Sequence, residues 1–164
     1  MICFDREIET KLSPDHLWTL IKQAFEDPSK SPVWPVELEE VEPFEMDEGQ
    51  TVRATYKLGS LRVRPSYSIT GYDEPLKTFS YASAPTHPLK GGATVLVYPR
   101  ANGSVLRWHG EYRLRLHPAA PAAALFVQLY FLDHFFERLE ENLRRYEADS
   151  SSTAQSFRPG ESRL

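Results

Sequence analysis

The chain has 164 residues, 41% hydrophobic and 26% charged, which is typical of one globular domain with its own core. Its formal net charge is −4, and its arginines are spread among acids, so we expect no nucleic-acid binding, which normally needs clustered basic residues. The single cysteine, Cys3, excludes a disulfide within the chain and a zinc site built on paired cysteines.

Neither export nor membrane insertion is indicated. The N-terminus, MICFDREIE, carries acids where an export signal needs an apolar run. The longest apolar run, from Ala122 to Leu132, is interrupted by Gln128 and is far shorter than the roughly 20 residues that span a bilayer. We therefore expect no membrane span and a cytoplasmic location.

The N-terminal part predicts a strand followed by a helix. Residues Ile2 to Lys11 alternate weakly between apolar and polar side chains, as in a strand. Ser13-Pro14-Asp15 then has the residues of a helix start: a capping Ser, Pro at the first helical position and an acid in the first turn. This helix should end before Pro28, and the proline-rich connection that follows should be anchored by Trp34.

The middle of the chain predicts a series of strands joined by short turns. Their expected ranges are Val36 to Met46, Gln50 to Leu58, Leu61 to Tyr72, Lys77 to Ala84, Thr94 to Tyr98 and Val105 to Leu116. Gly59-Ser60 is a candidate hairpin turn, and the segment from Pro85 to Gly92 is expected to be a loop. Pro65 cannot donate a ladder hydrogen bond, so it predicts an edge position or a bulge.

The C-terminal part predicts one long helix from Pro121 to about Asp149. An apolar stripe recurs at alternating steps of four and three residues. It consists of Leu125, Leu129, Leu132, Phe136, Leu139, Leu143 and Tyr146. Residues 150–164 are polar and aperiodic, so we expect a disordered tail after a single domain of residues 1–149.

With these elements in order, the chain resembles the START/Bet v 1-like (SRPBCC) superfamily, in particular its polyketide cyclase/dehydrase and lipid-transport-like members. The resemblance covers roughly residues 3 to 148 and rests on structural landmarks. These are Ser13-Pro14-Asp15-His16-Leu17-Trp18, Trp34-Pro35, Tyr72-Asp73-Glu74-Pro75, Gly103-Ser104-Val105-Leu106-Arg107-Trp108 and Leu139 to Glu147. It implies an α+β helix-grip fold: a curved seven-stranded antiparallel sheet around a long C-terminal helix, with one or two short helices after the first strand. It also implies a cavity between sheet and helix.

Aromatic side chains are the candidate ligand-binding residues. Alternation predicts that one sheet face meets the C-terminal helix and carries several of them, opposite phenylalanines of that helix. The candidates are Tyr56, Tyr67, Trp108, Tyr112, Phe131 and Phe135. Such a set either lines a pocket for a flat or acyl ligand or fills a dry core. The sequence pattern by itself favours the core, and the resemblance raises the pocket to an equal alternative.

Catalytic candidates are conditional on pointing into that cavity. His109 and Glu111 form the best acid/base pair, because a neighbouring carboxylate raises the pKa of an imidazole. Arg64 is a further candidate if it points inward beside a tyrosine. The alternative is an exposed strand face held by cross-strand ion pairs, and the apolar Trp108 and Tyr112 predict that His109 points away from the cavity.

Other chemistry has little support in the sequence. The five histidines include no pair at helix or strand ligand spacing, and the H-x-E of His109 and Glu111 lacks the paired cysteines of zinc deaminases, so no metal is expected. No nucleophile elbow and no phosphate-binding glycine loop is present, so no cofactor is expected.

Three functions are consistent with these residues. The first is binding or transport of a hydrophobic small molecule such as a lipid, a polyketide or an aromatic compound, by a monomer or weak homodimer. The second is a polyketide cyclase or dehydratase that uses the same cavity. The third is a protein-interaction module, which would show an exposed apolar groove over a filled interior.

Overall fold

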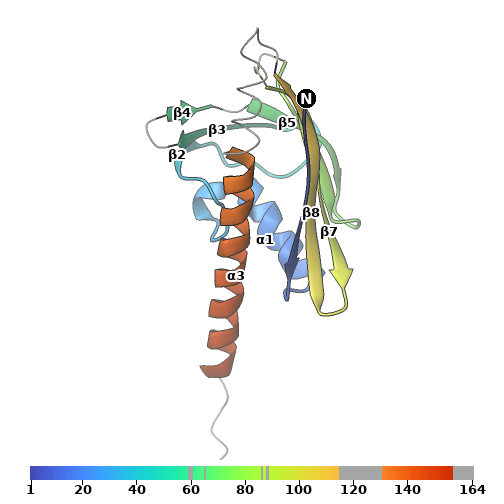
Figure 1. Ribbon diagram of the computed structural model, residues 1–164, viewed down its shortest axis with the longest axis vertical. Coiled ribbons are helices and arrows are strands. Elements are labelled where there is room, and N and C mark those ends of the chain that lie inside the picture. The colour runs from blue at the N-terminus through green and yellow to red at the C-terminus, as the bar shows by residue number, and fades with distance from the viewer. Residues whose placement is uncertain (59–60, 65, 86, 88, 115–130, 157–164) are drawn as a thin grey trace, which may run out of the picture.

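The computed structural model describes residues 1–58, 61–64, 66–85, 87, 89–114 and 131–156. It has an α+β architecture in which a strongly curved antiparallel sheet bends around two helices (Figure 1). The strands are β1 (Ile2–Thr10), β2 (Leu38–Val41), β3 (Thr51–Leu58), β4 (Leu61–Val63), β5 (Ser66–Asp73), β6 (Thr78–Ser83), β7 (Leu89–Arg100) and β8 (Gly103–Leu114). The helices are α1 (Pro14–Glu26), the short η1 (Pro28–Lys30) and the long α3 (Asp133–Ser156).

The strand order in the described part of the sheet is β1-β8-β7-β6-β5-β3-β2, with β4 paired to β3. The predicted strand from Leu61 to Tyr72 is divided into β4 and β5, which is the interruption expected around residue 65. Both pieces pair with β3, since Lys57 faces Arg62 and Thr51 faces Ser68. Pro65 and the predicted turn at Gly59-Ser60 lie outside the described residues.

Helix α1 begins and ends where the sequence predicts. The Ser13 side chain accepts a hydrogen bond from the backbone N–H of His16 at 3.3 Å, Pro14 is the first helical residue, and the helix ends at Glu26 before Pro28. Its buried face packs across the middle of the sheet against apolar residues of β6, β7 and β8. That face consists of Leu17, Trp18, Leu20, Ile21, Ala24 and Phe25.

Helix α3 runs beside β1 and α1 (Figure 1). Leu139 and Leu143 of the predicted stripe are fully buried. Asn142 donates hydrogen bonds to the backbone carbonyls of Val33 at 3.2 Å and Trp34 at 3.4 Å, which ties the proline-rich connection to the helix. The predicted helix start at Pro121 lies outside the described residues.

Three sequence predictions need correction. Helix α3 continues past Asp149 to Ser156, so the first residues of the predicted tail are helical. Strand β2 occupies only the middle of the predicted range from Val36 to Met46. Strand β7 begins at Leu89, so the end of the predicted loop belongs to the sheet. Gly91 and Gly92 lie in this strand, and the neighbouring backbones are too close there for a residue with a Cβ atom. A Cβ at Gly91 would lie 1.9 Å from the carbonyl oxygen of Glu111, and a Cβ at Gly92 would lie 2.1 Å from that of Tyr81.

Within the described ranges, none of the helices combines the length and the apolarity needed to cross a bilayer. The charged side chains of the described residues are all at least partly exposed, and the buried polar ones are Thr10, Thr55 and Ser104. The interior between sheet and helices is therefore apolar and aromatic.

Candidate ligand-binding site

The concave face of the sheet is closely packed at one end and partly accessible at the other. On β6, Phe79 is only 1% exposed because it packs against α1, whereas Tyr81 on the same face is half-buried. Strand β8 shows the same change from Leu106, which is 1% exposed, to the half-buried Tyr112. On β5 the fully buried Ile69 is followed along the face by the half-buried Tyr67. At this end of the sheet the inward-facing aromatics therefore keep accessible surface.

Four tyrosines, Tyr56, Tyr67, Tyr81 and Tyr112, bring their hydroxyls together in this region, and we call them the tyrosine cluster. Tyr112 donates a hydrogen bond to Tyr81 at 3.3 Å, and the indole N–H of Trp108 donates to the same Tyr81 oxygen at 3.1 Å. Tyr56 and Tyr67 are near enough for each phenol to influence the pKa of the other. The rings of Tyr67 and Tyr81 lie 5.0 Å apart, so the two pairs are neighbours.

Burial extends the pH range in which these phenols are neutral further into the alkaline region. Loss of solvation raises the pKa of Tyr56 to about 12 and the pKa of Tyr67 and Tyr81 well above the ordinary tyrosine range. The pKa of Tyr112 is raised by burial as well. Each member of the tyrosine cluster therefore keeps its proton at physiological pH and offers both a hydrogen-bond donor and an acceptor.

An aromatic wall of Trp34, Trp108, Phe131 and Phe135 lies beside the tyrosine cluster. Phe135 of α3 meets Trp34 edge-on at 5.7 Å and Trp108 edge-on at 5.3 Å between ring centroids. Phe131 lies 6.3 Å from Phe135, and Trp34 lies 6.1 Å from Tyr56. These edge-to-face and tilted contacts are favourable for aromatic pairs and give the wall a defined shape.

Trp34 carries an unpaired polar atom. Its indole N–H is buried and has no hydrogen-bond partner among the described residues. Leaving a buried donor unpaired costs about 1–3 kcal/mol, so such atoms are uncommon in folded proteins. The two carbonyl hydrogen bonds from Asn142 hold this segment in place against α3.

All six predicted ligand-binding residues belong to this region. Tyr56, Tyr67, Trp108 and Tyr112 lie on the concave sheet face, and Phe131 and Phe135 meet them from the helix side, as the alternation predicted. The sequence prediction missed Tyr81 and assigned Trp34 only an anchoring role. Tyr81 was recognisable, because it lies two residues after Phe79 on an alternating strand, whereas no local pattern shows where Trp34 points.

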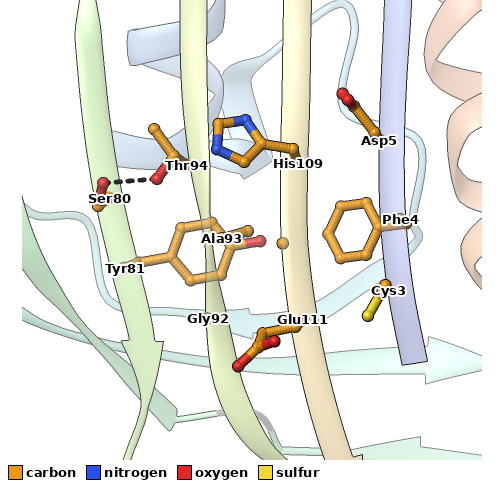
Figure 2. A pocket seen from close by; sticks show the side chains of 11 residues that line it. Cys3, Phe4, Asp5, Ser80, Tyr81, Gly92, Ala93, Thr94, His109 and Glu111 are labelled. Carbon is orange, nitrogen blue, oxygen red and sulfur yellow. Dashed lines mark hydrogen bonds between the residues drawn. The ribbon is translucent and has the colours of Figure 1, made fainter. Parts of the chain in front are cut away.

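The conditional catalytic pair is not in this interior. His109 and Glu111 are exposed on the convex face of β8, because Trp108 and Tyr112 take the inward positions. Figure 2 shows them in a shallow hollow with Asp5, Thr94 and Ser80, the last two joined by a 2.8 Å hydrogen bond. The condition for a role in the cavity is therefore not met.

The surroundings of this hollow are those of a solvated sheet face. Asp5 faces His109 across the strands and accepts hydrogen bonds from Arg107 at 3.0 and 2.6 Å, which hold the pKa of the Asp5 carboxyl below its usual range. Arg64 is likewise exposed, in a second surface hollow beside Arg53 and Glu40. In the part of the chain that the structure covers, no three His, Cys, Asp or Glu residues are grouped as metal ligands, and Cys3 is exposed.

The tyrosine cluster predicts a loss of stability at alkaline pH. In the unfolded chain these phenols ionise near pH ~10, whereas in the folded chain they stay neutral to higher pH. Their stabilising effect is therefore complete below pH ~10 and is lost as the pH rises through the folded-state values. We expect the free energy of unfolding, from urea denaturation, to fall above pH ~10 by about 1.4 kcal/mol per pH unit for each such phenol. Tyr56→Phe should make that slope shallower by the contribution of one phenol, about 1.4 kcal/mol per pH unit. An unchanged slope would contradict the raised pKa of Tyr56.

The arrangement as a whole defines a class of protein. A curved antiparallel sheet that wraps a long C-terminal helix, with an aromatic interior between them, is a helix-grip fold of the Bet v 1-like type. The chain belongs to the polyketide cyclase/dehydrase and lipid transport family, whose model matches residues 1–147. Membership of this family implies a cavity that binds a hydrophobic ligand.

Solved structures agree on the fold. A protein from Rhodobacter sphaeroides has a TM-score of 0.65 at 16% identity, covering 90% of this chain and 92% of its own. Ara h 8.0201 has a TM-score of 0.64 at 14% identity, covering 88% of this chain and 98% of its own. A protein from Thermus thermophilus has a TM-score of 0.63 at 18% identity, covering 88% of this chain and 97% of its own. No protein of curated function matches the sequence.

Proposed function

We propose that this protein binds or carries a hydrophobic small molecule, such as a lipid, a polyketide or an aromatic compound, between the sheet and helix α3. The main support for this proposal is a change in packing along one face of the sheet. On β5, β6 and β8 the inward-facing residues are closely packed at one end of this face and are half-buried aromatics at the other. A chain that needed only a dry core would bury Tyr67, Tyr81 and Tyr112 as completely as it buries Phe79. The family to which the chain belongs supports the same function.

A cyclase or dehydratase is less well supported as an alternative. Such an enzyme needs proton-transfer groups at the substrate, and His109, Glu111 and Arg64 lie outside the aromatic interior. Among the described residues, the tyrosine cluster and the aromatic wall offer only neutral phenols and indoles as polar groups. A protein-interaction module is also disfavoured, because the large hydrophobic residues exposed in the described ranges are only Met1 and Leu76, which form no groove.

Native mass spectrometry of the purified full-length chain, followed by titration with lipids and aromatic compounds, tests the proposal. We expect either a co-purifying small molecule or binding that quenches tryptophan fluorescence, because Trp34 and Trp108 belong to the aromatic wall. Phe135→Ala should weaken binding by roughly tenfold, since it removes about one aromatic side chain of buried contact.

Tyr146→Ala is the matched control for this variant. Tyr146 is also a half-buried aromatic residue of α3, but its partner is His16 of α1, whose ring nitrogen lies 3.0 Å from the Tyr146 hydroxyl. Its loss should leave affinity within about twofold while costing comparable stability. A protein that is empty after purification and binds no compound of either kind would refute the proposed function.

A further inference from the structure

The hydrogen bonds of the tyrosine cluster leave a proton without an acceptor. Trp108, Tyr81 and Tyr112 supply three protons, and the two hydrogen bonds among them use two. Whichever phenol donates within the Tyr81–Tyr112 pair, one phenolic proton has no acceptor among the described residues.

The surplus donor is also strengthened by its surroundings. Tyr81 accepts the indole N–H of Trp108, and a hydroxyl that accepts a hydrogen bond becomes a better donor. The buried indole N–H of Trp34 adds another donor without a described partner, and its ring lies 6.1 Å from that of Tyr56. Donors without a described partner therefore lie both on the sheet and on the segment that precedes β2.

Among the described residues, no charged side chain is buried in this region. Arg6 of β1 and Asp133 of α3 are paired with each other and are 48% and 34% exposed. Neither a cation that would neutralise a buried carboxylate nor an anion that would hold an amine is among the buried described residues. An ionised ligand group placed here would lose its hydration without gaining a counter-charge.

Resting on the proposed function, we infer that this site selects an uncharged aromatic ligand that carries a hydrogen-bond acceptor, a ketone or quinone oxygen being the simplest case. The acceptor oxygen takes the unpaired protons of Tyr81 or Tyr112 and of Trp34. The aromatic wall holds the flat apolar part of the ligand.

Three naphthalenes of nearly equal shape test this inference on the full-length chain. 2-Acetylnaphthalene has a neutral acceptor, 2-naphthoate has a charged one, and 2-ethylnaphthalene has none. We expect the ketone to bind roughly three- to tenfold more tightly than the hydrocarbon, which is the range of one hydrogen bond, and at least about tenfold more tightly than the carboxylate. The carbonyl infrared band of the bound ketone should shift to lower frequency, which requires no variant.

Tyr81→Phe and Trp34→Phe each remove one donor and keep an aromatic ring. Either variant should weaken binding of the ketone more than binding of the hydrocarbon, because only the ketone accepts a hydrogen bond. Tyr98→Phe is the control, because the Tyr98 hydroxyl donates to Glu7 at 2.9 Å on the convex face. Equal binding of ketone and hydrocarbon with an unshifted carbonyl band, or tightest binding of 2-naphthoate, overturns the inference while the proposed function stands. Binding of none of the three overturns both.

Discussion

Phe79→Ala is expected to lower the free energy of unfolding by about 3–5 kcal/mol, the usual cost of truncating a buried phenylalanine. Phe79 is 1% exposed at the place where α1 crosses the sheet. Its ring lies 4.7 Å from that of Phe25 in an edge-to-face contact and 6.0 Å from that of Trp18. Because both partners are held by the rest of α1, the surroundings cannot collapse to fill the space. Chemical denaturation measures the change.

Leu76→Ala is the control for this prediction. Leu76 lies close to Phe79 in sequence but is 66% exposed, so its truncation should change stability by less than about 0.5 kcal/mol. Similar losses for both variants would mean that the packed end of the concave face is not the stable part of the fold. The difference in burial between Phe79 and Tyr81 would then no longer support a ligand-binding site at the Tyr81 end of the sheet.

Gly91→Ala is expected to destabilise the protein by about 3 kcal/mol or more, through strained backbone and steric clash together. Gly91 has φ of +141°, which L-amino acids with side chains rarely adopt. A Cβ there would also lie 1.9 Å from the carbonyl oxygen of Glu111 and 2.9 Å from the Cα of Tyr112. Strand β8 has to move away, and Tyr112 moves with it. Thermal denaturation should show the loss, and weaker ligand binding should accompany it.

Gly71→Ala tests whether the effect belongs to this position. Gly71 is a strand residue of β5, and a Cβ added to it meets nothing within 4 Å. Its replacement should therefore change stability by no more than about 0.5 kcal/mol. If Gly91→Ala were equally mild, the close approach of β7 and β8 would be wrong.

The family and the fold were predictable from local sequence signals. Ser13-Pro14-Asp15 predicted the start of α1, and the alternation around Trp108 and Tyr112 predicted which side chains point inward. The same alternation placed His109 and Glu111 on the opposite face, where the structure has them. These predictions succeeded because capping, proline geometry and the two-residue period of strands act between near neighbours.

Local sequence patterns predicted the order of strands and helices and an aromatic sheet face, and the family resemblance added the helix-grip fold. Tertiary structure decided that Tyr81 joins Tyr112 and Trp108 in one hydrogen-bond network, that the Trp34 N–H has no described partner, and that Gly91 is a strand residue rather than part of a loop. Each of these depends on distances between segments that are far apart in the chain. Such distances follow from sheet register and helix packing, and no local periodicity encodes them.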